Sequence, residues 1–321
     1  MSLIQHDMNQ LPAFRFHHLT ATVLLILLIT ASISCKKSSS STSSTDSTGK
    51  SGSGALLSKY VLVAANVSGA TVDSVVYNYQ YDGNNNLTGL QQSTTITLSG
   101  AVSGTTISYT MTYSGNVITG LTGTANENVT ISSNSYSATT QVNTTFQSSG
   151  GHVTSYVQHA TTTGSPLVPT SPLLANDSAL LTYDAKGNIA TLTLYQIDPQ
   201  NGQYLLSSTE SFTFSGGNLS QTVLVTYAGG VAADTFTSNY QYDSKVSAVP
   251  LYLVPGIAII NANNLTQSVD TETGVNPGSV TTNYTNTYNS ANQPSSSTAT
   301  VTTTPANSGV IATENITYTY Q

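Results

Sequence analysis

The chain has 321 residues and a formal net charge of −7, and only 7% of its residues are charged. Beyond position 59 its only lysines are Lys186 and Lys245, and it has no arginine there. Such a surface repels phosphate backbones, so the composition excludes nucleic-acid binding. Threonine, serine, asparagine, tyrosine and valine dominate the same part of the chain, which favours strands and turns over helices.

The first 35 residues have the layout of a signal peptide. An unbroken apolar run, Val23–Ile29, follows Arg15 and is too short to span a bilayer. The segment Ser32–Cys35 resembles a lipobox, although serine stands three places before the cysteine where leucine is usual. Cys35 is the only cysteine, so we expect it to carry lipid and to attach the protein to a membrane. The alternative is a secreted protein without lipid, cut near Ala31.

Residues 36–57 are expected to form a flexible tether, because serine, threonine and glycine dominate them. Lys36 and Lys37 follow the cysteine directly. In lipoproteins of some Gram-negative bacteria, acidic residues at this place are associated with surface export. By that resemblance, we expect an outer-membrane lipid anchor that faces the periplasm rather than the cell surface. Residues 58–321 then form a single β domain.

One pattern recurs along that domain: alternating aromatic residues, a turn rich in glycine and asparagine, and then a β-branched residue or leucine. Each copy predicts a hairpin. Eight copies at a spacing of about 30–35 residues predict roughly sixteen strands. The copies are Tyr77–Leu87, Tyr109–Val117, Phe146–Val153, Tyr183–Ile189, Phe212–Leu219, Tyr240–Lys245, Tyr284–Asn292 and the terminal Tyr318–Tyr320.

The strands alternate aromatic or aliphatic residues with threonine and serine, so each has one apolar and one polar face. The predicted fold is therefore all-β: a large antiparallel meander of repeated hairpins, strongly curved or folded into two packed layers, since so many strands cannot stay flat. The rival is a membrane-spanning barrel. That architecture needs an apolar band toward lipid and a polar lumen, which the threonine-rich strands disfavour.

These hairpins resemble YD (Rhs-type) repeats, whose units read Tyr-Asp-x-x-Gly-Asn followed by Ile or Leu. The segment Tyr183–Ile189 matches this form fully, and Tyr81-Asp82 and Tyr242-Asp243 match its opening. With its leader, the chain resembles uncharacterised bacterial lipoproteins that carry degenerate versions of the pattern. The resemblance implies an architecture and brings no activity with it.

The irregular segment Val249–Ile260 contains two prolines and a glycine, which preclude a regular central strand, and it is strongly apolar. Two interpretations follow. The segment is a plug that covers one end of the sheet, or it is a lid over an apolar ligand cavity. In the second case the residues that face the ligand are Leu251, Tyr252, Leu253 and Ile257.

Other candidates have structural interpretations as well. Asp82, Asp184 and Asp243 each begin a turn, and a local side-chain hydrogen bond is favoured over a calcium site. Within the turn that Asp184 opens, Gly187 and Asn188 are expected at positive φ. The tyrosines form either a cross-strand ladder in the core or a sugar-stacking platform. We find no metal-ligand spacing, cofactor motif or catalytic motif.

Three classes of function remain open. The sequence favours a non-enzymatic binding or carrier lipoprotein of the envelope, with a partner that is either an apolar small molecule or another envelope component. A structural or adhesive envelope protein is the alternative. An enzyme is disfavoured, because charged side chains are scarce.

Overall fold

The computed structural model describes residues 55–66, 72–98, 101–131, 134–164, 176–198, 201–247, 249–274, 277–304 and 312–321. Cys35, the predicted leader and residues 36–54 of the predicted tether lie outside these ranges. No helix in the described ranges is both long and apolar enough to cross a membrane.

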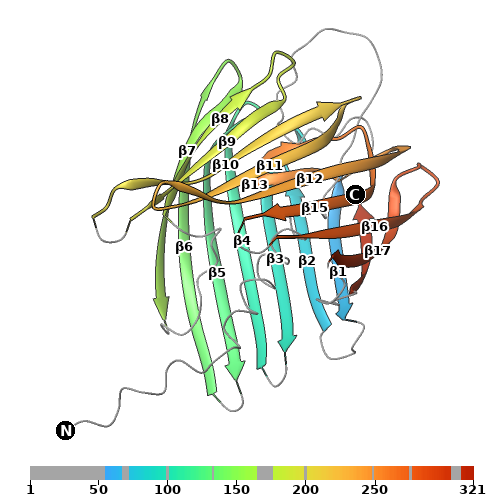
Figure 1. Ribbon diagram of the computed structural model, residues 1–321, viewed down its shortest axis with the longest axis horizontal. Helices are drawn as coiled ribbons and strands as arrows, with labels where there is room; N and C mark the ends of the chain where they lie inside the picture. The colour runs from blue at the N-terminus through green and yellow to red at the C-terminus, as the bar shows by residue number, and fades with distance from the viewer. Residues whose placement is uncertain are drawn as a thin grey trace.

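Sixteen strands of the described chain close into one antiparallel barrel, shown in Figure 1. Neighbours in sequence are neighbours in the barrel, except that β12 pairs with β15, and β1 pairs with β18 to close the ring. The strands are β1 (Leu57–Asn66), β2 (Val72–Tyr81), β3 (Leu87–Leu98), β4 (Ala101–Ser114), β5 (Val117–Ile131), β6 (Asn134–Ser149), β7 (His152–Gly164), β8 (Asp177–Tyr183), β9 (Ile189–Ile197), β10 (Tyr204–Ser215), β11 (Asn218–Ala228), β12 (Val231–Val246), β15 (Asn263–Thr273), β16 (Gly278–Tyr288), β17 (Pro294–Thr304) and β18 (Ala312–Tyr320).

The predicted all-β meander of hairpins is thus confirmed, and its curvature goes as far as complete closure. At the closing seam, Tyr60 lies opposite Tyr318, and Leu62 lies opposite Ile316. Closure pairs both edges of the sheet with each other, so neither edge is left as a template for other chains.

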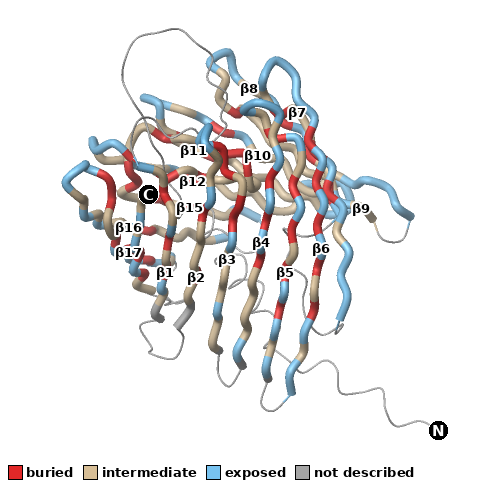
Figure 2. The backbone as a smooth tube through the Cα atoms, turned by 180° about the vertical axis from the view of Figure 1, so that it is seen from behind, coloured by how far each residue is buried: buried red, intermediate tan, exposed pale blue. Residues whose placement is uncertain are grey.

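The apolar face of the sheet is turned inward. Along β6, Val142, Thr144 and Phe146 are buried, whereas Gln141, Asn143 and Thr145, which alternate with them, are exposed. Because successive side chains of a strand point to opposite faces, the buried set of a closed sheet lines the lumen. Figure 2 shows this alternation of buried and exposed residues along the strands of the rear wall.

Three turns at one end of the barrel, which we call the turn end, repeat the same hydrogen bonds. They are 82–86, 184–188 and 289–293. In each, the side-chain oxygen of the first residue accepts from the backbone N–H groups two and four residues later, at 2.8–3.0 Å. The favoured Asx-turn interpretation is therefore confirmed for Asp82 and Asp184.

The fourth residue of each of these turns has positive φ. Gly187 has a φ of 82°, and Asn85 and Asn292 occupy the same place with 65° and 60°. The prediction for Gly187 is confirmed, but the prediction for Asn188 is wrong. Asn188 instead donates its side-chain amide to Asp184 Oδ2 at 2.8 Å, which a residue outside the left-handed region can do.

Four tyrosines at the turn end fasten their strands to the preceding hairpin. Their hydroxyl groups donate to a backbone carbonyl at the start of the neighbouring return strand, at 2.7–2.8 Å. The pairs are Tyr113 to Leu87, Tyr183 to Val153, Tyr242 to Leu219 and Tyr320 to Pro294. These four tyrosines therefore have a structural role, because each satisfies a backbone acceptor at the end of the barrel.

Candidate functional site

The connection between β12 and β15 enters the lumen at the turn end. It forms a small hairpin of β13 (Leu251–Val254) and β14 (Ile257–Ile259). The hairpin starts from β12 and reaches the wall on the far side of the ring, formed by β2, β4 and β5. There the ring of Tyr252 stacks on that of Tyr79, with centroids 6.1 Å apart.

Gly256 at the tip of this hairpin lies against Ile118 and the hydroxyl of Tyr113, so that a Cβ atom at this position would collide with Ile118. Its φ of 91° also suits glycine. The hairpin is held at its base as well, where Asn261 Oδ1 accepts from the backbone N–H of Leu219. Both ends of the segment are therefore fixed to opposite walls.

The four residues predicted to face a ligand all belong to this hairpin. Leu251 and Ile257 are buried, with 6% and 3% of their surface exposed, and Tyr252 and Leu253 are partly buried against the same core. The segment fills the turn end of the lumen, the place that the plug interpretation requires. That any of the four faces a ligand remains a prediction.

An aromatic layer surrounds the hairpin. It consists of inward side chains near the turn end, including Tyr60, Tyr79, Tyr109, Phe146, Tyr156 and Phe212. Rings of neighbouring strands meet edge to face within it: the centroid of Tyr60 lies 5.7 Å from that of Tyr77 and 5.6 Å from that of Tyr318. Because Tyr60 and Tyr79 are buried, the ladder interpretation fits them better than a solvent-facing sugar platform.

One step further from the turn end, the lining of the lumen becomes polar and acidic. Four acidic residues occupy inward-facing positions of their strands there: Asp177 on β8, Glu210 on β10, Asp270 on β15 and Glu314 on β18. We call them the carboxyl layer. Hydroxyl and amide groups separate them along the wall, among them Thr144, Gln158, Thr222, Ser238 and Ser268, all buried.

Asp270 is 7% exposed and lies opposite Ser238 of β12. Its Oδ2 accepts from the Ser268 hydroxyl at 3.3 Å, while its buried Oδ1 has no hydrogen-bond partner. Burial raises the pKa of Asp270, and hydrogen bonds from Ser238 and Ser268 oppose that effect in part.

Glu314 is 2% exposed and lies between Ala64 of β1 and Ala299 of β17, which offer no hydrogen bond from their side chains. Its Oε2 is buried without a partner, and burial raises its pKa to about 7. The pKa of Glu210 is raised to about 7 for the same reason. These groups titrate near neutrality because water cannot solvate their charged forms.

Asp177 is 5% exposed and ends a short polar chain. Thr144 donates to Gln158 at 3.1 Å, and Gln158 donates in turn to Asp177 Oδ2 at 3.5 Å. The other oxygen, Oδ1, is buried without a partner. Burial raises the pKa of Asp177 to about 7.

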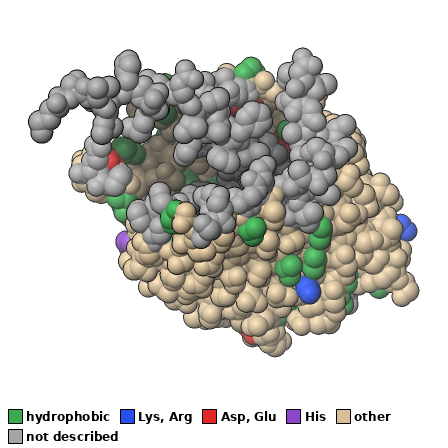
Figure 3. Space-filling model, turned by 90° about the horizontal axis from the view of Figure 1, so that it is seen from below, with side chains coloured by type: hydrophobic (Ala, Val, Ile, Leu, Met, Phe, Trp, Pro, Cys, Tyr) green, Lys and Arg blue, Asp and Glu red, His purple; other side chains and the backbone are tan. Residues whose placement is uncertain are grey.

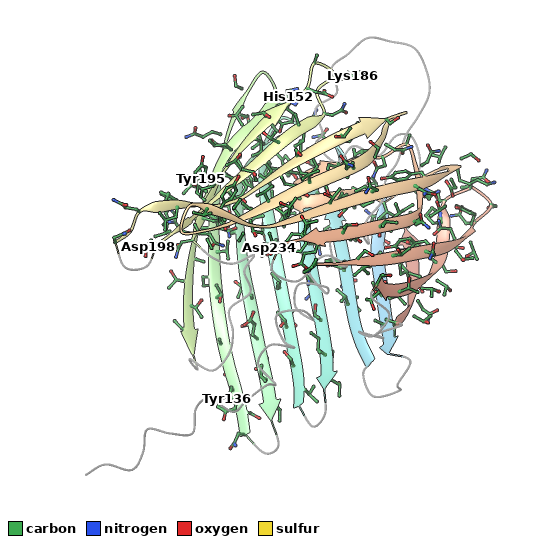
Figure 4. All side chains as sticks on the ribbon, viewed as in Figure 1. Tyr136, His152, Lys186, Tyr195, Asp198 and Asp234 are labelled. Atoms are coloured by element: carbon green, nitrogen blue, oxygen red, sulfur yellow. The ribbon has the colours of Figure 1, made fainter. Side chains whose placement is uncertain are left out.

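The basic side chains of the described residues lie elsewhere. Lys59, Lys186 and Lys245 are all exposed. Lys245 is at the turn end, where its Nζ donates to Asn292 at 3.2 Å and lies 5.7 Å from the ring centroid of Tyr288. Figure 4 shows Lys186 and His152 at the turn end and Tyr136 at the opposite end of β6.

The turn aspartates do not take part in the site. Asp243 accepts from the backbone N–H of Lys245 and from the hydroxyl of Tyr288, in keeping with a turn role. His152 packs against the ring of Tyr183, with centroids 4.5 Å apart. Among the described residues, no three His, Cys, Asp or Glu side chains come together to hold a metal ion.

Sequence reasoning missed the carboxyl layer, although parity along the strands could have found it. In β18, Glu314, Ile316 and Tyr318 alternate with Asn315, Thr317 and Thr319. Glu314 therefore occupies a position of the apolar face. The signal is an acidic residue at a position where the alternation of the strand predicts an apolar, inward-facing side chain. Burying a carboxyl group is costly, so such a residue indicates a functional or structural requirement.

No protein-family model matches the chain, and no curated protein sequence matches it either. Solved structures do resemble it. A porin-like protein from Bacteroides uniformis ATCC 8492 has a TM-score of 0.48 at 14% identity, covering 83% of this chain and 96% of that one. Another porin-like protein, from Bacteroides vulgatus ATCC 8482, has a TM-score of 0.35 at 10% identity, covering 84% and 99%.

Proposed function

We propose that this chain is a non-enzymatic binding protein of the bacterial envelope that holds a small molecule inside its barrel. One observation carries the proposal: a ring of sixteen strands has its apolar face turned inward. A ring of about eight strands can be filled by its own side chains, whereas about sixteen leave a wide lumen. Here the β13–β14 hairpin occupies one end of that lumen, and the carboxyl layer lies beyond it.

The outer surface supports a barrel that lies in water rather than in lipid. Outward positions carry threonine, serine, asparagine and glutamine, as Gln141, Asn143 and Thr145 do on β6. A membrane-spanning barrel needs the opposite arrangement, with an apolar band outside. Figure 3 shows the molecule from below, where hydrophobic side chains are few and scattered on the described part of that face.

Attachment to the envelope is proposed to come from Cys35. In this account the cysteine carries lipid and holds the barrel at the outer membrane, facing the periplasm. The support is the sequence alone: an apolar run before the single cysteine, and a serine-rich segment after it. A barrel tethered in this way remains in water, and we propose that its ligand enters from the end opposite the hairpin.

Binding of Nile red, a neutral apolar dye that fluoresces in apolar surroundings, tests the proposal. The full chain with Cys35→Ser should bind the dye, so that the dye fluorescence rises and then saturates as dye is added. The matched controls Leu180→Ala and Leu205→Ala remove exposed apolar side chains, 51% and 48% exposed, and should leave the affinity unchanged. If either control abolishes binding, the dye sits on the outer surface. If the chain binds no dye at all, the result favours a structural or adhesive envelope protein over a binding protein.

A further inference from the structure

The buried acids of the lumen are not explained by the stability of the barrel. An unpartnered buried oxygen costs free energy, because it has lost its hydrogen bonds to water and gained none in the protein. Asp177, Asp270 and Glu314 each bury one such oxygen, and each is more than nine-tenths buried. Apolar residues of similar size would avoid that cost. Three of them in one layer call for a partner that the described residues do not supply.

The missing partner is a hydrogen-bond donor, because a carboxylate offers only acceptors. None of the described lysines is placed to serve, since Lys59, Lys186 and Lys245 are all exposed. Each acid also has separate neighbours: Gln158 beside Asp177, Ser238 and Ser268 beside Asp270, and two alanines and Tyr60 beside Glu314. The layer therefore presents single carboxyl groups at intervals around the wall, each next to apolar or weakly polar surface.

The aromatic layer supplies the complementary apolar surface. Tyr60 is close enough to Glu314 for the charge of that glutamate to act on its hydroxyl group, and Tyr240 is in the same relation to Asp270 and Glu210. Aromatic faces attract organic cations as well as apolar groups. A ligand that meets both layers has an apolar body and a positively charged, hydrogen-bond-donating head.

We propose that the lumen binds an amphipathic organic cation, an alkyl or aryl ammonium compound whose head meets Asp270 or Glu314 and whose body lies against the aromatic layer. This inference rests on the proposed binding function and adds the chemical class of the ligand. A charge-assisted hydrogen bond to a buried carboxylate is worth roughly twice a neutral one, so the head group determines selectivity.

Three probes with the same tail test the class of ligand: octylammonium, octanol and octanoate. Each is titrated against Nile red bound to the full chain with Cys35→Ser. Octylammonium should displace the dye at a concentration at least about tenfold lower than octanol, which corresponds to one charge-assisted hydrogen bond. Octanoate should be weakest. Equal potency of all three overturns the cation inference but leaves the binding function intact, whereas failure of Nile red to bind overturns both.

Isosteric variants locate the head group. Asp270→Asn with Glu314→Gln removes both charges while preserving size, and should abolish the advantage of octylammonium over octanol. The control Asp184→Asn removes an exposed charge at the turn end, where Asn289 shows that asparagine forms the same turn. It should keep the full advantage. The proposal is contradicted if the double variant still binds octylammonium more tightly than octanol. An unfolding temperature at or above that of the parent shows that the variant is folded.

Discussion

At the scale of single residues, the positive φ at the fourth place of the end turns determines which residue can stand there. Glycine fills that place in the 184–188 turn, and asparagine fills it in the other two. A β-branched side chain in the left-handed region crowds its own backbone. The sequence predicted this turn because a Gly-Asn pair follows an aspartate, but it could not tell which residue of the pair takes the strained conformation.

We predict that Gly187→Val lowers the free energy of unfolding by more than about 1 kcal/mol. A side chain at this position would also touch the ring of His152, 3.4 Å from its Cβ. Ala185→Val, in the same turn but without positive φ, is the matched control and should change stability by less than about 0.5 kcal/mol. Urea unfolding of both variants measures the difference. Equal effects would count against the turn geometry.

The raised pKa of Glu314 makes stability depend on pH. Its pKa is about 7 in the folded protein and 4.5 ordinarily. The folded state therefore holds the proton more tightly, and stability falls as pH rises from about 4.5 to about 7. Above that range the charged, buried group destabilises the fold by on the order of 3 kcal/mol, at about 1.4 kcal/mol for each tenfold change in proton affinity.

Glu314→Gln should remove this dependence. At pH 8 we expect the variant to unfold at a higher temperature than the parent chain, and at pH 4.5 the two should converge, because the glutamate is then neutral in the folded state. Thermal unfolding at both pH values checks the expectation. The control is Asp184→Asn, whose carboxyl has a lowered pKa because of hydrogen bonds from Asn188 and Lys186. Its effect should not change between pH 5 and 8.

The carboxyl layer should also make ligand binding depend on pH. An alkylammonium stays charged up to about pH 10, as a lysine does, whereas Glu314, Asp177 and Glu210 ionise near pH 7. Glu314 faces Ala64, Ala299 and Tyr60, and Asp270 faces Ser238, Val280 and Tyr240. Tyr60 and Tyr240 have pKa values raised by burial and stay neutral. Octylammonium affinity should therefore rise between pH 5.5 and 8, and an unchanged affinity would contradict a carboxylate head-group site.

At the scale of elements, the β13–β14 hairpin is the least predictable part of the fold. Its prolines and glycine showed that it could not be a regular central strand, and its apolar character showed that it had to be buried. What it packs against does not follow from the sequence. Its contacts Tyr79, Tyr113 and Ile118 lie more than 130 positions away in the chain and meet it only because the barrel closes.

If the hairpin is part of the core, truncating it should be costly. We predict that Ile257→Ala destabilises the protein by about 2–5 kcal/mol, the usual range for a buried aliphatic side chain. Leu205→Ala, at an exposed position on β10, should cost less than about 0.5 kcal/mol. Chemical unfolding gives both values. A small cost at position 257 would mean that the hairpin leaves the lumen readily and does not serve as a fixed plug.

At the scale of the whole molecule, alternation along the strands predicted which face is buried but not that the sheet closes. A curved open sheet, two packed layers and a barrel all satisfy the same alternation. The pairing of β1 with β18 distinguishes the barrel from the other two architectures. In that pair Tyr60 lies opposite Tyr318, although almost the entire domain separates them in sequence. Local sequence cannot specify so distant a register, although it did predict about sixteen strands and their turns.

The proposed lipid anchor determines the location of the whole molecule, because it would attach the barrel to the membrane. We predict that metabolic labelling with a fatty-acid probe marks the chain and not its Cys35→Ser variant. The variant should also leave the membrane fraction for the soluble one, since no other lipid-carrying residue is expected. Equal labelling of the two proteins, or membrane association that survives the substitution, would contradict the anchor.

The barrel turns its apolar face inward, and we propose that it stands in water. The chain has no tryptophan, so a single introduced one reports its own surroundings. Phe146→Trp on the inward face should emit at short wavelength and resist quenching by acrylamide. Thr145→Trp, next to it on the outward face, should emit as in water, be quenched freely, and be unaffected by vesicles of brominated lipid. Short-wavelength emission from position 145, quenched by the brominated lipid, would show a barrel embedded in the membrane and contradict the account.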